Sequence, residues 1–159
     1  MKAEMTEIVM PGDANHLGTC FGGKIMSWVD MVAAIAAQRL VGTVVTASVD
    51  RIEFKKPIKV GDIVTLLAKV NAVWNSSMEV GVKVLIQSPK EVDSLEWGLE
   101  RWWNEIDKPV QACKAYLTFV AVDSKGNRRN VNDYALFIDD TTREEEANQR
   151  RKIRLENKK

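Results

Sequence analysis

The most apolar stretch of the chain lies near its beginning, at residues 24–41. Apolar side chains there surround the axis of a predicted helix, at Ile25, Met26, Trp28, Val29, Met31, Val32, Ile35 and Leu40. The pattern predicts a helix that is buried on most faces and ends at Gly42, because glycine tolerates a positive φ. A membrane span is the alternative. It is disfavoured because Asp30 in mid-segment would cost roughly 2.5 to 3.5 kcal/mol in a bilayer, and because strand-like sequence follows at once.

Asp30 is the one ionisable residue between Lys24 and Arg39. At helical spacing its neighbours are mostly small, so a strand or a second subunit can approach closely: Met26, Ser27, Ala33, Ala34 and Ala37. We therefore expect a cleft beside Asp30. A structural carboxylate capped by hydrogen bonds and a catalytic carboxylate are both compatible with the helix alone.

Elsewhere, apolar and polar residues alternate with the period of β-strands. A short strand is predicted at 6–10, before the turn Pro11-Gly12, and a longer one at 43–54, where a change of parity indicates a bulge near Asp50-Arg51. Strands at 63–74 and 77–86 share a hairpin at Asn75-Ser76, with Glu79 expected on the outside. A last strand at 110–122 ends in a turn with Gly126. This order predicts an α+β fold in which an antiparallel sheet wraps one long helix.

Two segments depart from this pattern. Between Pro89 and Pro109 apolar residues recur every three to four positions, which predicts an inserted amphipathic helix near 90–108, either covering a sheet edge or forming a tryptophan-lined lid. The main domain is expected at 1–133 and a charged tail at 134–159. In the tail, Thr142 and Glu145 resemble a capping box, so a solvated helix or a frayed segment is expected. Three arginines there form a solvated face or reach a phosphate: Arg150, Arg151 and Arg154.

Composition narrows the chemistry. The charges nearly cancel, with 23 Lys plus Arg against 22 Asp plus Glu, so nucleic-acid and anionic-membrane partners are not indicated. No apolar export segment begins the chain and there are two cysteines, which favours a cytoplasmic location. His16 is the only histidine and no zinc-type cysteine cluster exists, so no metal site is expected. Phosphate-binding and dinucleotide-binding glycine motifs are also absent.

Several motifs in order resemble those of the hotdog-fold acyl-CoA thioesterases. They are DANHLGT at 13–19, FGG at 21–23, WVD at 28–30, TASVD at 46–50, Phe54 with Pro57-Ile58, VGD at 60–62 and NSSMEV at 75–80. The resemblance covers about residues 6–126. It implies a helix wrapped by an antiparallel sheet, dimers with active sites at their interface, trimers of dimers, and acyl-CoA as substrate with no further cofactor. The inserted helix departs from the family pattern and leaves acyl-chain preference and hexamer geometry open.

Carried over residue by residue, the resemblance implies that Asn15 and Asp30 are catalytic and are contributed across the interface. Asp30 is then a base for water or a nucleophile, while Asn15 polarises the thioester carbonyl or orients the water. The amides of Gly22 and Gly23, at the start of the helix, are candidate oxyanion donors. The hairpin residues Asn75, Ser76 and Ser77 are candidates for binding coenzyme A.

Each of these residues also has a structural interpretation. Asn15 and the hairpin residues suit turns by their chemistry alone, and His16 fits loop support better than proton transfer. Two further functions remain open: a hydroxyacyl dehydratase or hydratase of the same fold, which would use His16, and a non-catalytic acyl-CoA sensor. The intact pair Asn15 and Asp30 favours the hydrolase.

Overall fold

The computed structural model describes residues 1–89, 108–138 and 140–157. Its described elements confirm the α+β class. In chain order they are β1 (Lys2–Ile8), the 3₁₀ helix η1 (Pro11–Asp13), α1 (Gly22–Val41), β2 (Val44–Phe54), β3 (Ile63–Val73), β4 (Ser77–Gln87), β5 (Val110–Ala121), the 3₁₀ helix η2 (Asn132–Phe137) and α3 (Thr141–Glu156). The helix predicted near 90–108 and its tryptophans fall outside the described residues, apart from Lys108.

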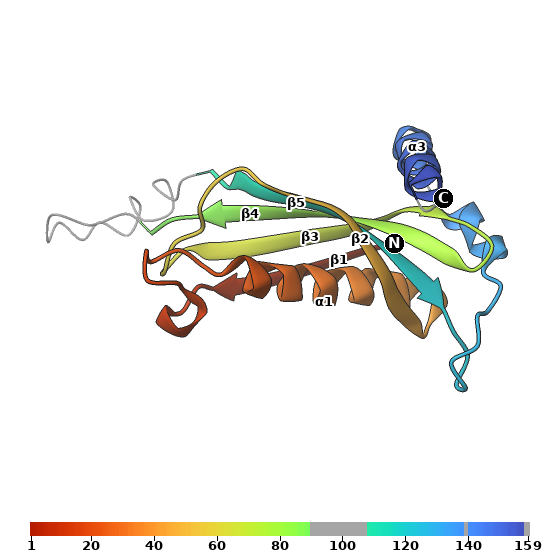
Figure 1. The fold of residues 1–159 in the computed structure, drawn as a ribbon, viewed down its shortest axis with the longest axis horizontal. Helices are drawn as coiled ribbons and strands as arrows, with labels where there is room; N and C mark the ends of the chain where they lie inside the picture. The colour runs from red at the N-terminus through yellow and green to blue at the C-terminus, as the bar shows by residue number, and fades with distance from the viewer. Residues whose placement is uncertain (90–107, 139, 158–159) are drawn as a thin grey trace, which may run out of the picture.

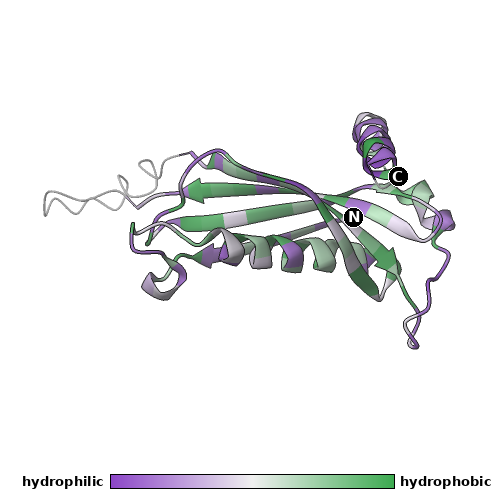
Figure 2. Ribbon diagram, viewed as in Figure 1, coloured by the Kyte–Doolittle hydropathy of each residue, from purple (hydrophilic) through white to green (hydrophobic). Residues whose placement is uncertain are grey.

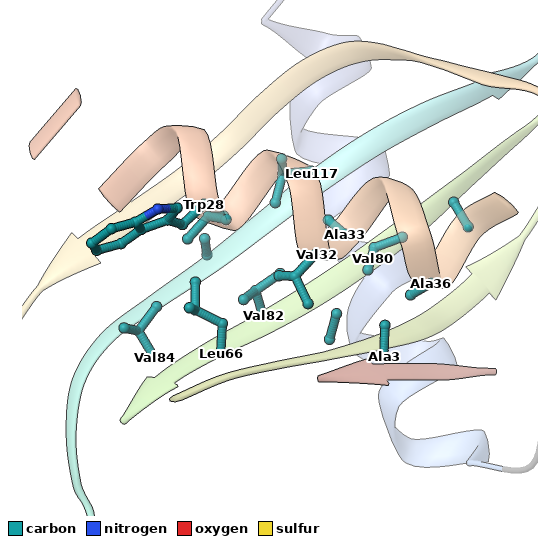
Figure 3. Close-up of a cluster of buried hydrophobic side chains, with 14 of the residues drawn as sticks. Ala3, Trp28, Val32, Ala33, Ala36, Leu66, Val80, Val82, Val84 and Leu117 are labelled. Atoms are coloured by element: carbon teal, nitrogen blue, oxygen red, sulfur yellow. The ribbon is translucent and has the colours of Figure 1, made fainter. Parts of the chain in front are cut away.

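The strands form one antiparallel sheet in the order β1-β3-β4-β5-β2, so β1 and β2 are its edges. Helix α1 lies along one face of the sheet and α3 crosses the other face (Figure 1). We call these the inner face and the outer face. The hydrophobic core fills the layer between α1 and the inner face, where Val32 and Ala36 of the helix meet Leu66, Val82 and Leu117 of the strands (Figure 3).

Several local predictions are confirmed. Helix α1 ends at Val41, and Gly42 follows with a φ of 81°. Strand β2 is irregular at two places in its pairing with β5, one of them between Val49 and Arg51, where the change of parity predicted a bulge. Strands β3 and β4 form the predicted hairpin, closed by a hydrogen bond from the Trp74 amide to the Ser77 carbonyl.

The first strand lies earlier than predicted. It spans Lys2–Ile8 rather than 6–10, because β1 pairs with β3 over its whole length, from Lys2 opposite Lys69 to Ile8 opposite Ile63. Polar residues such as Glu4 obscure this pairing in the sequence, since they face outward on an edge strand.

The prediction that α1 is buried on most faces is wrong. Met26, Met31 and Ile35 are 41%, 44% and 37% exposed, along the side of the helix that the sheet does not cover. A single sheet can bury only one broad stripe of a helix, so the chain leaves an apolar stripe of α1 uncovered.

The predictions for the C-terminal tail and for Glu79 also need correction. Helix α3 is not a solvated element but is held on the outer face, and its N-cap is Asp140, whose side chain accepts from the Arg143 amide, rather than Thr142. Glu79 points outward from β4 as expected, yet it is only 1% exposed because Arg150 of α3 covers it. The helix is hydrophilic over most of its length (Figure 2), so polar contacts hold it in place.

Candidate active site

Asp30 lies on the uncovered side of α1, where the helix passes edge strand β2. Its Oδ1 accepts a hydrogen bond of 2.7 Å from the hydroxyl of Thr46 on β2. Thr46 pairs with Phe119, a core residue of β5, so its side chain points toward the inner face and α1. The hydrogen bond fixes one carboxylate oxygen of Asp30, and the half-buried side chain stays accessible.

Sequence reasoning did not single out Thr46, although it lies in the TASVD motif. A threonine in a strand is ordinarily explained by β-propensity alone. Only the packing of β2 beside α1 shows that its hydroxyl reaches Asp30. The remaining signal in the sequence was its position at the start of an edge strand that directly follows the helix.

Asn15 lies in the loop before α1, and its side chain closes that loop. Its Oδ1 accepts from the amide of Leu17 at 2.9 Å, and its Nδ2 donates to the hydroxyl of Thr19 at 2.9 Å. The loop is anchored to the segment before β3 by the Cys20 amide, which donates to the Ile58 carbonyl at 2.7 Å. Within one chain, the hydrogen bonds of Asn15 therefore stay in its loop and do not reach Asp30.

A second contact ties this loop to the helix. The ammonium group of Lys24 lies 3.0 Å from Asp13 Oδ1 and 5.2 Å from the centre of the Trp28 ring. The hydrogen bond from Lys24, with a further one from the Met10 amide, lowers the pKa of Asp13. The loop before α1 is thus tied to the helix through Asp13 and Lys24 and to the segment before β3 through Cys20 and Ile58.

Gly22 and Gly23 open α1, and both are exposed. The first amides of a helix have no acceptor within it and carry the positive end of its dipole. An added Cβ at Gly23 would meet nothing within 4 Å, while at Gly22 it would meet the Phe54 ring at 3.6 Å. Apart from the Phe54 ring, the described residues therefore leave the space beside these two glycines clear.

Within one chain the hairpin residues Asn75, Ser76 and Ser77 lie far from the loop that carries Asn15, although Thr46 shares a row of the sheet with Phe119 and Met78. Thr19 bridges to Lys59, just before β3 begins, whereas Asn75 follows the far end of β3. The eleven residues of that strand span about 35 Å. The hairpin packs instead beside the end of β5, where its Ser76 carbonyl accepts from the Ala121 amide at 2.9 Å.

Exposed apolar side chains continue from α1 onto β2. Val49 and Phe54 are 42% and 51% exposed and flank the strand edge that has no partner among the described residues. Together with Met26, Met31 and Ile35 they form exposed apolar surface on the helix and the strand that carry Asp30 and Thr46, and we call these five residues the open apolar face. In the described part of the chain, no helix has the length and apolarity that crossing a membrane requires.

Comparisons with known proteins agree with this fold. A family model described as the thioesterase superfamily matches residues 17–92. A solved acyl-CoA hydrolase from Staphylococcus aureus, in complex with butyryl coenzyme A, coenzyme A and coenzyme A disulfide, is 35% identical with a TM-score of 0.73, covering 99% of this chain and 92% of that one. The chain belongs to the hotdog-fold acyl-CoA thioesterases. A hexameric hotdog-fold thioesterase of Campylobacter jejuni is 33% identical with a TM-score of 0.69, over 84% of this chain and 92% of that one.

Some members of this family are much longer. Acyl-coenzyme A thioesterase 11 of Mus musculus is 34% identical over 155 residues, which is 97% of this chain but 24% of that protein. The chain thus spans about a quarter of the length of this relative. The Staphylococcus aureus hydrolase has also been solved as three alanine variants, which replace an asparagine, an aspartate and a threonine.

Proposed function

We propose that the protein hydrolyses acyl-CoA thioesters to free coenzyme A and a carboxylic acid. The observation that carries this proposal is the half-buried carboxylate of Asp30, which lies beside exposed apolar side chains and is oriented by Thr46. A thioester needs an oriented nucleophile and stabilisation of its oxyanion, because thiolate is a good leaving group. Both requirements can be met by a carboxylate, amide groups and water.

Asp30 acts on the carbonyl carbon by one of two routes. As a base it takes a proton from water, the water oxygen bonds to the carbonyl carbon, and the C–S bond then breaks to release the thiolate of coenzyme A. As a nucleophile it forms a transient anhydride that water hydrolyses. In both routes Asn15 polarises the carbonyl or orients the water, and the amides of Gly22 and Gly23 donate to the developing oxyanion.

The spacing of the residues supports this assignment. In the Staphylococcus aureus hydrolase the replaced aspartate follows the replaced asparagine by fifteen positions, which equals the spacing of Asn15 and Asp30. The replaced threonine follows that aspartate by seventeen positions, close to the sixteen that separate Asp30 from Thr46. We therefore include Thr46 as the residue that positions Asp30.

The site is proposed to be completed by a second copy of the chain. Asn15 and Asp30 make their hydrogen bonds to different elements, and the unpaired edge of β2 beside the open apolar face suits a sheet continued into a partner. In an antiparallel pair the far end of the partner's sheet approaches this site. That arrangement supports the assignment of Asn75, Ser76 and Ser77 to coenzyme A. The hexamer of the Campylobacter jejuni thioesterase supports a trimer of such dimers.

Free-thiol release tests the proposal directly. The wild type is assayed with short, medium, long and aromatic acyl-CoAs beside Asp30→Ala, Asn15→Ala and a control, Asp133→Ala, which removes an exposed carboxylate elsewhere. We expect thiol release in the wild type and control, and losses of at least roughly a hundredfold in the two site variants with oligomer size unchanged.

Two results would contradict the hydrolase. Saturable coenzyme A binding without thiol release from any ester would favour the sensor. Hydration of an enoyl-CoA that is lost in His16→Ala would favour the dehydratase or hydratase.

A further inference from the structure

The outer face of the sheet carries a groove of about 770 Å³ that the proposed reaction does not use. Its lining comes from the first half of α3 and strands β1, β3, β4 and β5, with Arg39 of α1 reaching the edge at Lys2. Figure 1 shows that α3 lies on the side of the sheet opposite to α1. Its floor lies at Gly81, in the middle of the sheet, which pairs with Lys69 on one side and Tyr116 on the other. Because glycine has no side chain, the Asn71 side chain lies close over Gly81 and forms part of the floor.

Positive charge dominates the lining of this groove. Among the residues that the structure describes, three carboxylates line it, from Glu4, Asp140 and Glu146, against six cationic side chains, from Lys2, Arg39, Lys69, Lys83, Lys114 and Arg143. The chain as a whole is nearly neutral, with a formal charge of +1. The excess of three positive charges is therefore a local property of the groove.

The lysines are arranged in a way that costs stability. Lys2 is directly opposite Lys69 across β1 and β3, and Lys83 is directly opposite Lys114 across β4 and β5. Like charges in directly opposed positions of a sheet repel each other. Two such pairs in adjoining rows of one groove indicate that an anion between them would be bound favourably.

Internal partners do not neutralise all of this charge. Lys69 and Arg143 are partnered within the chain, both at Asp140 Oδ2, at 3.2 and 3.0 Å, which leaves Lys83 and Lys114. In residues 1–89, 108–138 and 140–157, neither Lys83 nor Lys114 has an ion pair with a carboxylate. Glu53, which is opposite Lys114 on β2, pairs with Arg51 instead.

A neighbouring hollow of about 520 Å³ under the second half of α3 shows the contrast. Its three arginines each have a carboxylate partner: Arg51 with Glu53, Arg150 with Glu79 and Arg154 with Asp50. The arginines of that hollow are satisfied within the chain, whereas Lys114, which lines both sites, has no carboxylate partner among the described residues.

A second, independent observation also indicates a ligand. Asn71 lines the groove and is 2% exposed, and its Nδ2 donates to Glu79 at 2.9 Å. Its Oδ1 has no hydrogen-bond donor among the residues that the structure describes. Buried polar atoms are nearly always satisfied, so a ligand with a hydroxyl or N–H group would complete this one.

We propose that the groove between α3 and the outer face binds a phosphate-bearing small molecule through Lys2, Lys69, Lys83 and Lys114. The phosphate oxygens accept from the opposed lysines around Asn71, whose side chain covers Gly81, and a donor on the rest of the ligand bonds Asn71 Oδ1 when that side chain turns toward it. This site lies on the opposite side of the sheet from Asp30, and its existence does not depend on the hydrolase activity.

Calorimetric titration with sodium tripolyphosphate at low ionic strength tests the site on the full chain. The test variant is Lys83→Gln with Lys114→Gln. The matched control is Lys125→Gln with Lys152→Gln, which removes the same charge from exposed positions outside the groove. We expect saturable binding to the wild type and control, and affinity lowered by roughly tenfold or more in the test variant, since charge-assisted contacts are lost.

Three results would overturn the proposal: no saturable binding, equal weakening in test and control variants, or unchanged affinity in the test variant. Equal weakening would show that only net charge attracts the probe. A parallel titration with coenzyme A identifies the source of the phosphate. A loss of coenzyme A affinity confined to the test variant assigns the groove to the nucleotide end of the substrate, and unchanged affinity assigns it to a separate phosphate compound.

Discussion

The guanidinium of Arg150 on α3 holds the buried carboxylate of Glu79 on β4. Two hydrogen bonds join them, from Nη2 to Oε1 at 2.7 Å and from Nε to Oε2 at 3.0 Å. The guanidinium also lies 3.8 Å from the centre of the Tyr116 ring. Burial by itself would lower the pKa of Arg150, but the bonds to Glu79 outweigh this effect and raise it. Helix α3 is therefore attached to the sheet by an ion pair, and the buried Glu79 carboxylate would be costly without its cation.

Replacing Arg150 should destabilise the fold strongly. Arg150→Met leaves Glu79 buried without its cation, which we expect to lower the free energy of unfolding by about 3 kcal/mol. Adding Glu79→Gln should restore much of this loss, because the amide is neutral and its oxygen can still accept from Asn71. Urea denaturation of the wild type, both single variants and the double variant gives the coupling energy. Additive effects of the two substitutions would contradict the importance of this pair.

This ion pair shows where sequence patterns stop being informative. Glu79 alternates correctly with its neighbours, so its position on the outer face could be predicted. Its burial could not, because it depends on a helix whose partner residue lies 71 positions away. Helix α3 has little apolar periodicity and resembles a solvated tail. Specific contacts hold it on the sheet, such as the ion pair of Arg154 with Asp50 and the stacking of Arg151 over the Trp74 ring. A hydrophobic pattern in the sequence does not predict such contacts.

The structure on the inner side of the sheet could be predicted better, because apolar contacts hold it together. Apolar periodicity marks α1 and the core strands, so their order and the hairpin could be derived. The candidate site was derived only in part. Asp30 stands out as a lone acid in an apolar helix, but the contact with Thr46 requires knowing which strand lies beside which turn of α1. The exposure of Met26, Met31 and Ile35 likewise depends on how much of the helix one sheet can cover.

Gly81 should not tolerate a side chain. A Cβ there would lie 2.7 Å from Asn71 Nδ2, which is held by Glu79, so Gly81→Ala must displace a buried hydrogen bond. We expect a loss of about 1 to 3 kcal/mol in unfolding free energy, measured by urea denaturation. Gly12→Ala is the matched control, because an added Cβ there meets nothing within 4 Å and its φ is not in the left-handed region. Equal stability of the two variants would show that Asn71 can move aside freely.

Thr46 should matter for catalysis through Asp30. Thr46→Val keeps the shape and β-propensity of the side chain but removes the donor to Asp30, so we expect kcat to fall by roughly ten- to a hundredfold with KM little changed. Thr46→Ser retains a hydroxyl and should recover most of the rate. Equal loss in both variants would show that a hydroxyl alone does not restore the rate, and would contradict the role assigned to this hydrogen bond.

Val49 should lie at the interface between two copies of the chain. It is exposed on edge strand β2 within the open apolar face, where a charge would oppose burial against a partner. Val49→Lys is therefore expected to yield monomers in light scattering and to lose hydrolase activity, because each proposed site needs both copies. Ile153→Lys, at an exposed apolar position on α3, is the control and should keep at least the dimer. An intact dimer in Val49→Lys would place the interface elsewhere.

The two cysteines should differ sharply in reactivity and give a pH-dependent readout of the core. Burial raises the pKa of the Cys113 thiol to about 11, while Cys20 is only half-buried. Ellman's reagent at pH 8 should therefore titrate one thiol in the native chain and two in urea, and none in native Cys20→Ala.

The unfolded chain ionises Cys113 near the ordinary pKa of 9.0, at a lower pH than the folded chain does. Ionisation thus favours unfolding as the pH rises from 9 toward 11, and the contribution is intact below pH 9. Urea midpoints at pH 8 and pH 10.5 should fall further for the wild type than for Cys113→Ala, which has no thiol to ionise there. Parallel pH dependence in the two proteins would mean that water reaches Cys113 and that the β5 side of the core opens in the native state.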